Sequence, residues 1–486
     1  ESALGAVKEQ NAEIYIGTVK NHAATTGKYG TFVMDNLRIY RGCPAGAIDN
    51  VDFSVAQDIQ VAPGGKAASV AVTPQGMAAE VTYRASYSSD NEEIKVNEKG
   101  EVTATANARK GGTVTTTVYC PSHAPIVRKT VVNLKNAAET LAEIGFKVEK
   151  LEEKVLPGWK GQRKVEVAEW IRLDKSCKTN YHSDNTDVAV VDEDGVVTAK
   201  REGTANISVT VSVGTTSKTE TYALLTVGKE IAKFDFSGNL NDSTKGNAAS
   251  VYKGNIEYED KGMVGKAVKL TGGGLNLNRN NIGDDYTVSV WLKSDQDFAA
   301  ENLAMLFLGH HDKERWVSVA TQGKGSTAKL WTYQVEDNQG GHYNKRDELV
   351  QMNDFCKTGW HNVAIVGKKD KLTLYVDGKA IVTDSKSVNP LKGANQGILL
   401  GATHWDNPFG GLADGAHIYN ASMTDELLYS TIKTEAVESV QYWMGLAGEE
   451  LKRPTLSTAS KKALQQAYDA ASSLVKAQKA EITALM

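Results

Sequence analysis

The sequence has 486 residues, of which 23% are charged, and its formal net charge is -4. This length exceeds what one hydrophobic core normally serves, so several domains are expected. No cluster of lysine and arginine follows a predicted strand or helix, so a nucleic-acid-binding surface is not expected. No apolar run reaches the length of about eighteen residues that a membrane-spanning helix needs.

Residues up to about 430 form short runs of alternating polar and apolar residues, separated by Gly, Asn, Asp and Ser. This pattern is typical of strands joined by turns. Asp194-Gly195 and Asp377-Gly378 stand between apolar runs and predict tight hairpins. The sequence therefore predicts a mainly β chain, with helical periodicity only after Thr424.

The pattern Asp-x-x-x-Ile-Tyr occurs twice, at 35–40 and at 414–419. About 180 residues of strand-like sequence precede the second copy, whereas only about thirty residues precede the first. We therefore expect residues 1–45 to be the last strands of a truncated domain, and the chain to be a piece of a longer multidomain protein.

A second repeat joins 96–104 to 191–199, which share the pattern Val-x-Glu-x-Gly-x-Val-Thr-Ala. The two copies lie 95 residues apart, a suitable length for a small β-sandwich. Residues 185–209 closely resemble the group 2 bacterial immunoglobulin-like (Big) repeat, and residues 50–134 keep the same skeleton with an insertion. The resemblance implies two immunoglobulin-like β-sandwiches, at 46–134 and 135–228.

Residues 229–432 resemble a laminin-G-like, concanavalin A-like jelly roll. Four phrases carry this resemblance in the expected order, and they lie at 234–243, 286–293, 360–379 and 410–419. The resemblance implies one complete jelly roll, in which Trp291 and Trp360 occupy core positions.

After the jelly roll the sequence predicts a short C-terminal helical segment. Thr424 is expected to cap a short helix over 427–432. Residues 433–486 are expected to be a helical linker followed by a new amphipathic helix from about 455, with a further helix near Ala480. This segment resembles the start of a FIVAR-type helical module, and the helix from 455 would then lack a partner.

Catalytic patterns were sought because some jelly rolls are glycosidases. Glycoside hydrolysis needs two carboxylates across the scissile bond, and no E-x-D-x-x-E string occurs. No G-x-S-x-G, H-E-x-x-H or phosphate-binding loop occurs either. No catalytic site is therefore expected in this chain.

Calcium is a candidate metal because it favours oxygen ligands from loops and strand ends. The jelly-roll resemblance implies a structural calcium that links the first and last strands, with Asp414 and either Asp242 or Asn241 as ligands. Asp35 would be the counterpart in the first copy. In the alternative interpretation, Asp242 caps a turn and Asp414 faces solvent.

Sugar binding asks for exposed aromatic rings beside polar side chains. The ligand-binding candidates are Trp331, Tyr333, His342, Tyr343, His404, Trp405 and Asn407. Trp331 and Tyr333 share one face of a predicted strand, and that face is either a binding platform or part of the core. Trp405 is the best single candidate for an exposed stacking residue.

Together these features predict a non-catalytic carbohydrate-binding and spacer region of a larger secreted or cell-surface bacterial enzyme that acts on glycans, such as a glycoside hydrolase. The expected partner is a polysaccharide or the glycan of a glycoconjugate, and the chain is expected to be monomeric. The alternative is an adhesin or surface-scaffold stalk that binds a protein or a host glycan.

Overall fold

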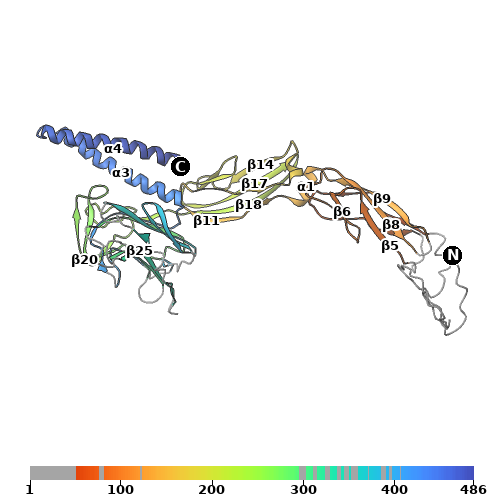
Figure 1. Ribbon diagram of the computed structural model, residues 1–486, viewed down its shortest axis with the longest axis horizontal. Helices are drawn as coiled ribbons and strands as arrows, with labels where there is room; N and C mark the ends of the chain where they lie inside the picture. The colour runs from red at the N-terminus through yellow and green to blue at the C-terminus, as the bar shows by residue number, and fades with distance from the viewer. Residues whose placement is uncertain are drawn as a thin grey trace, which may run out of the picture. The chain divides into compact units, whose positions relative to one another are not determined.

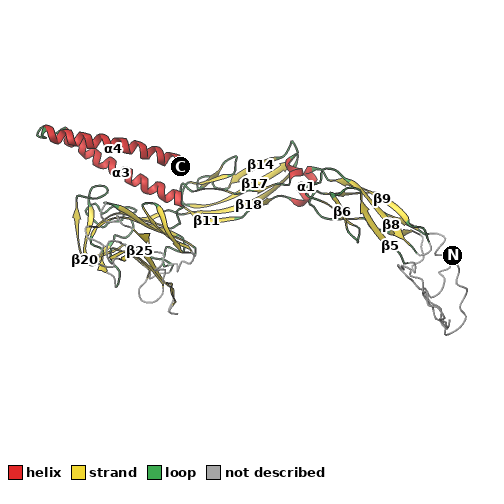
Figure 2. Ribbon diagram, in the orientation of Figure 1, coloured by secondary structure: helices red, strands yellow, loops and turns green. Residues whose placement is uncertain are grey.

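A computed structural model describes residues 51–75, 82–120, 123–294, 303–309, 315–322, 329–336, 341–343, 350–351, 359–369, 371–384, 390–392, 397–404 and 407–485. Strands predominate in this part of the chain, and two long helices follow them (Figure 2). The expected mainly β fold class is confirmed. The chain divides into two compact units that meet in sequence at Leu134 and Lys135, apart from Ala62–Gly65, which groups with the second unit. The truncated domain expected at 1–45 lies outside the described residues.

The first unit contains a small β-sandwich. One sheet has the order β2-β9-β8-β5, the other has the order β3-β7-β6, and β1 pairs with β4. The strands are β1 (Asp52–Ser54), β2 (Asp58–Val61), β3 (Ala68–Ser69), β4 (Thr73–Gln75), β5 (Arg84–Ser89), β6 (Ile94–Val96), β7 (Glu101–Ala104), β8 (Gly112–Tyr119) and β9 (Ile126–Leu134).

The second unit begins with a sandwich that has the same strand order. Its sheets are β11-β18-β17-β14 and β12-β16-β15, and β11 is parallel to β18 as β2 is to β9. Its elements are α1 (Ala137–Ile144), β10 (Lys147–Val148), β11 (Leu151–Val155), β12 (Lys160–Gln162), β13 (Val165–Glu166), α2 (Glu169–Arg172), β14 (Lys178–Ser183), β15 (Ala189–Val191), β16 (Val196–Ala199), β17 (Gly203–Val213) and β18 (Thr216–Val227).

The repeated sequence pattern forms the same turn in both sandwiches. The side-chain oxygens of Asn97 and Asp192 each accept hydrogen bonds from the amides two and four residues further on. Gly100 and Gly195 have φ values of 75° and 81°, which glycine adopts without strain. A Cβ atom on Gly195 would lie only 2.6 Å from Cζ of Tyr181, so ring packing also requires glycine there.

The third domain contains a sheet of fifteen strands. Its main path is β26-β25-β24-β23-β31-β21-β33-β22-β28-β29-β30, with β19, β20, β27 and β32 attached at its sides. The strands are β19 (Glu230–Phe234), β20 (Ser250–Glu259), β21 (Ala267–Asn276), β22 (Tyr286–Ser294), β23 (Leu303–Gly309), β24 (Arg315–Gln322), β25 (Lys329–Glu336), β26 (Gly341–Tyr343), β27 (Val350–Gln351), β28 (His361–Lys368), β29 (Lys371–Val376), β30 (Lys379–Asp384), β31 (Gly397–Leu400), β32 (Asn407–Pro408) and β33 (Gly411–Tyr419).

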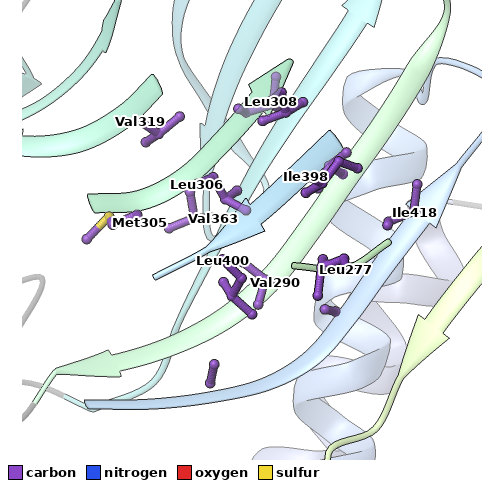
Figure 3. Packing of buried hydrophobic residues seen from close by; sticks show 14 of the residues in the cluster. Leu277, Val290, Met305, Leu306, Leu308, Val319, Val363, Ile398, Leu400 and Ile418 are labelled. Atoms are coloured by element: carbon purple, nitrogen blue, oxygen red, sulfur yellow. The ribbon is translucent and has the colours of Figure 1, made fainter. Parts of the chain in front are cut away.

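This sheet curves into two layers that face each other across one core. Val319 of β24 and Val363 of β28 are far apart in the strand order, yet both belong to the same buried cluster. Figure 3 shows them with leucine, isoleucine and valine side chains from β22, β23, β31 and β33. We call the part of the sheet around β23, β24 and β31 the β24 layer, and the part around β22, β28 and β29 the β28 layer. The arrangement is the jelly roll that the sequence predicts, and the hairpin expected at Asp377-Gly378 joins β29 to β30.

Two long helices follow the jelly roll and lie side by side (Figure 1): α3 (Asp425–Leu451) and α4 (Thr458–Leu485). The predicted cap is confirmed, because the Thr424 hydroxyl accepts a hydrogen bond from the amide of Leu427. The expectation that this helix ends at Ile432 is wrong. The further helix expected near Ala480 is also wrong, because α4 continues to Leu485, and the partner that α4 was expected to lack is α3.

Helix α3 covers the outer face of the β28 layer. Leu428 and Ile432 belong to an apolar cluster with Trp291, Ala364 and Tyr375, which alternate along their strands with residues of the inner core. The β28 layer is therefore buried on both faces. This explains why β22 and β28 are buried along almost their whole length.

A buried ion pair fixes the loop that follows β19. The carboxylate of Asp242 has no exposed surface and pairs with the guanidinium of Arg279, which is 10% exposed. It also accepts hydrogen bonds from the amides of Lys233, Thr244 and Gly246. Burial alone would raise the pKa of Asp242, but these amides, the Thr244 hydroxyl and Arg279 together hold the pKa below its usual value.

We predict that Asp242→Ala lowers the free energy of unfolding of the jelly roll by about 3–5 kcal/mol, because Arg279 loses its buried counter-charge and three amides lose their acceptor. The measurement is chemical unfolding of the full chain, followed by hydrogen exchange in β19 and β33. Asp260→Ala is the control, because Asp260 is 82% exposed and its pair with Lys266 is weak. If both substitutions lowered the free energy of unfolding equally, the buried pair of Asp242 and Arg279 would not have the stabilising role assigned to it.

Candidate functional site

The outer face of the β24 layer carries a cluster of aromatic side chains, which we call the aromatic face. Phe307 of β23 and Trp316 of β24 stack with ring centroids 5.8 Å apart, and Leu399 of β31 completes a buried cluster with them. Their neighbours along the strands, such as Leu306 and Val317, point into the core. Strand alternation thus presents these rings on the side of the sheet that faces away from the core.

The aromatic face continues to an exposed tyrosine at its edge. Tyr252 of β20 is 37% exposed, and its hydroxyl lies 2.8 Å from Nδ1 of His404. The His404 ring meets the Tyr252 and Phe307 rings edge to face, with centroids 5.5 and 5.4 Å away. Burial raises the pKa of Tyr252, so its hydroxyl stays protonated at neutral pH.

The neighbouring strands of the β24 layer carry four more predicted ligand-binding residues. Trp331 and Tyr333 lie in β25 and pair in register with Ala320 and Ser318 of β24. His342 and Tyr343 lie in β26, which pairs with β25. The side chains of these four residues lie outside the described part of the structure, so the choice between platform and core for Trp331 and Tyr333 stays open.

The two remaining predicted sugar-binding residues, Trp405 and Asn407, follow His404 closely in sequence. Asn407 is exposed in β32, which pairs with the start of β23. Trp405 lies outside the described residues. On β24, the hydroxyl of Ser318 is buried and makes no hydrogen bond within the described residues.

A second feature is a pocket of about 480 Å³ between the jelly roll and α3, which we call the acidic pocket. It is lined by residues of the loop after β19, by β22 and β33, by the loop at Met263 and by α3. Asp414 of β33 and Glu435 of α3 are its most buried carboxyl groups. Asp235, Asn239 and Asn241 also line it.

Asp414 is held by backbone amides. Its Oδ2 accepts a hydrogen bond of 2.7 Å from the amide of Met263, and its Oδ1 accepts one of 2.8 Å from Gly415. Burial raises the pKa of Asp414 to about 7, more than these amides lower it. The carboxyl group therefore exchanges its proton close to neutral pH.

The two predicted metal ligands lie in different surroundings. Asp242 does not fit calcium, because its oxygens already bind Arg279 and three amides. The alternative ligand, Asn241, lines the acidic pocket with Asp414. Among the described residues, no three His, Cys, Asp or Glu side chains form a metal cluster. The calcium site stays a prediction.

Two residues of these features were not expected from sequence. Glu435 was missed because the helix was expected to end before it. Tyr252 was missed because β20 is polar and largely exposed, so nothing in its pattern marks this tyrosine as a neighbour of His404. The signal that could have marked Tyr252 is the apolar pair Val251-Tyr252 within a largely polar strand.

The family comparisons agree with the strand topology. Residues 269–427 match the model of the concanavalin A-like lectin/glucanases superfamily, and residues 155–222 match that of the bacterial Ig-like domain (group 2). The chain thus contains a concanavalin A-like jelly roll and a group 2 bacterial immunoglobulin-like domain. No curated protein matches the chain.

Solved structures similar to this chain include a domain of an extracellular enzyme and binding domains of toxins. One is domain 4 of AbnA, an extracellular GH43 arabinanase of Geobacillus stearothermophilus in complex with arabinotriose (26% identity, TM-score 0.33, 42% of this chain and 97% of that chain). Another is the binding domain of Paraclostridial Mosquitocidal Protein 1 (18%, TM-score 0.30, 42% and 52%). A third is the binding domain of botulinum neurotoxin serotype D (15%, TM-score 0.30, 42% and 51%). Because these TM-scores are below 0.5, the fold assignment rests on the family matches and the strand order.

None of the helices in the described part of the chain has the length and apolar character needed to cross a membrane.

We predict that Asp414→Asn flattens the pH dependence of jelly-roll stability. The folded protein holds this proton more tightly than the unfolded chain, whose carboxyl has a pKa near 3.8. The contribution of Asp414 to stability is therefore complete below that value and is lost as the pH rises through about 7. Urea unfolding from pH 4 to 8 with a chelator present measures the slope.

Asp260→Asn is the control for this prediction and should keep the slope of the unsubstituted chain. An unchanged slope in Asp414→Asn would show that Asp414 titrates in its usual range.

Proposed function

We propose that the jelly roll is a carbohydrate-binding module of an extracellular or cell-surface bacterial protein that acts on glycans. In this proposal the immunoglobulin-like sandwiches are spacers. The observation that carries it is the aromatic face, where stacked rings, a tyrosine hydroxyl and an imidazole gather on one side of a concanavalin A-like sheet.

The chemistry of this surface suits a sugar chain. Aromatic rings pack against the apolar faces of sugar rings, while hydroxyl, amide and imidazole groups exchange hydrogen bonds with the sugar hydroxyls. Tyr252 and Asn407 are exposed at its edge, and the β25 and β26 strands extend the same layer with Trp331, Tyr333 and Tyr343. A polysaccharide or the glycan of a glycoconjugate is the ligand class that this combination favours.

The alternative proposal is an adhesin or surface-scaffold stalk. Two sandwiches of the same strand order favour it, because serial domains of this kind extend a chain without binding a ligand.

We predict that Tyr252→Ala and His404→Ala each weaken glycan binding at least about tenfold, a loss of about 1.4 kcal/mol. The reason is that each substitution removes a ring and the hydrogen bond between the two side chains. The full chain would first be screened on an array of plant, microbial and host glycans, and the affinity for the best ligand would then be measured by calorimetry.

Tyr119→Ala is the matched control, because Tyr119 is also 37% exposed but belongs to the first sandwich. It should leave the affinity unchanged. If no glycan binds the unsubstituted chain, the stalk alternative replaces this proposal.

We also propose a calcium ion in the acidic pocket, with Asp414 as a ligand and Asn241 beside it. The support is the collection of hard oxygen donors that line this pocket, which includes Asp235 and Asn239. An ion there would join the loop after β19 to β33 and so stabilise the closure of the sheet.

We predict that calcium binds more tightly as the pH rises through about 7, because the ion needs the ionised carboxylate of Asp414. Calorimetric titration of the full chain with calcium chloride at pH 5.5 and 8 measures this. Asp414→Asn should abolish binding and Asp260→Asn should preserve it. Equal binding by both variants would place any calcium elsewhere.

A further inference from the structure

A buried histidine links β33 and β19 to α3. His417 of β33 is 7% exposed, and its Nδ1 lies 2.6 Å from Oε1 of Glu230 in β19. Its Nε2 lies 3.5 Å from Oε1 of Glu435 in α3. The contact with Glu435 is an ion pair, so two carboxylates flank the imidazole and this geometry suits the cationic form. The second oxygen of Glu435 accepts a hydrogen bond of 2.7 Å from Nε1 of Trp291, which fixes the carboxylate.

Glu435 lies between two parts of the contact between α3 and the jelly roll. The N-terminal part is mainly apolar, and in the C-terminal part α3 donates hydrogen bonds to a loop. On its N-terminal side, Leu428 and Ile432 are buried in an apolar cluster, and Asp425 accepts a hydrogen bond from the Tyr375 hydroxyl. On its C-terminal side, Ser439 and Trp443 donate hydrogen bonds to backbone carbonyls of the loop at Met263, and Ala436 packs against the edge of the apolar cluster. The ion pair at Glu435 therefore lies in the middle of the contact between α3 and the sheet.

We propose that His417 is a proton-dependent clamp that holds the middle of α3 against the jelly roll and keeps the acidic pocket closed on that side. When the imidazole loses its proton it can donate from one nitrogen only. The neutral imidazole keeps its hydrogen bond to Glu230, and Glu435 of α3 is left without the imidazolium charge beside it. The stretch from about Lys433 to Leu446 then opens more often.

The charged groups around His417 set the direction of the effect. Burial would lower the pKa of His417, but the hydrogen bond to Glu230 and the charges of Glu435 and Glu230 outweigh burial and raise it, although Lys233 of β19 opposes them. Tyr419 stacks on the imidazole at 6.3 Å and stays neutral because burial raises its own pKa. Asp414 and Glu438 line the same pocket.

The sign follows from this raised pKa. The clamp contributes fully below the ordinary histidine pKa of 6.5, and its contribution is lost as the pH rises through the higher pKa of folded His417. Burial also raises the pKa of Glu435, which adds a loss in the same direction at lower pH.

Hydrogen exchange of the full chain from pH 6 to 9, corrected for intrinsic exchange rates and with a chelator present, tests the proposal. Protection of α3 peptides over 433–446 should fall by up to about tenfold per pH unit as the one proton is released. Peptides of the inner core strand β23 should not change over this range. His417→Gln and Glu435→Gln should show weak protection in α3 that no longer varies with pH.

His182→Gln is the control, because His182 is exposed in the second sandwich. If His417→Gln keeps the pH dependence of the unsubstituted chain, the proposal is overturned. If that variant does not fold, a direct NMR titration of the His417 imidazole in the unsubstituted chain decides. A pKa at or below 6.5 would overturn the clamp, and a higher one would support it.

Discussion

The burial of the β28 layer on both faces is the constraint on which the rest of this domain depends. Its inner residues pack against the β24 layer, while its outer residues, Trp291 and Tyr375 among them, pack against α3. Without the helix this face would expose a large apolar surface to water. Each Å² of such exposure costs about 25 cal/mol of folding free energy. Helix α3 is therefore part of the jelly roll's packing, although it follows the last strand in sequence.

That constraint also separates the two candidate regions. Because α3 covers the β28 layer, the exposed sheet surface that remains is on the β24 layer, where the aromatic face lies. The acidic pocket, by contrast, exists because α3 closes one side of it with Glu435 and Glu438. One region packs rings on the outer face of the sheet with Tyr252 exposed at the edge. The other encloses the carboxyl groups of Asp414 and Glu435, whose pKa values are raised by burial.

The sequence predicted the strands and the tight turns because alternation and turn residues act locally, as at Asp377-Gly378. It predicted the jelly roll through the resemblance of four phrases to that family. It did not predict the length of α3. This helix contacts the sheet on one side and α4 on another, and it buries Ser430 and Ser439, so no single apolar stripe marks it. Site residues were predicted where they cluster in sequence, such as His404 and Asn407. Tyr252 could not be found from sequence, because it lies 152 residues before His404. The two side chains meet only because β20 pairs with β21 in the folded sheet.

The two sandwiches share one strand order and one turn, and this has a consequence for synthesis. Neighbouring domains with interchangeable strands are prone to exchange them while folding. Here the segment before β14 differs: the second sandwich has α1, α2 and the short pair β10–β13, whereas the first has β1 paired with β4. A strand from one sandwich would thus meet mismatched flanking segments in the other, which disfavours entanglement of the nascent chain.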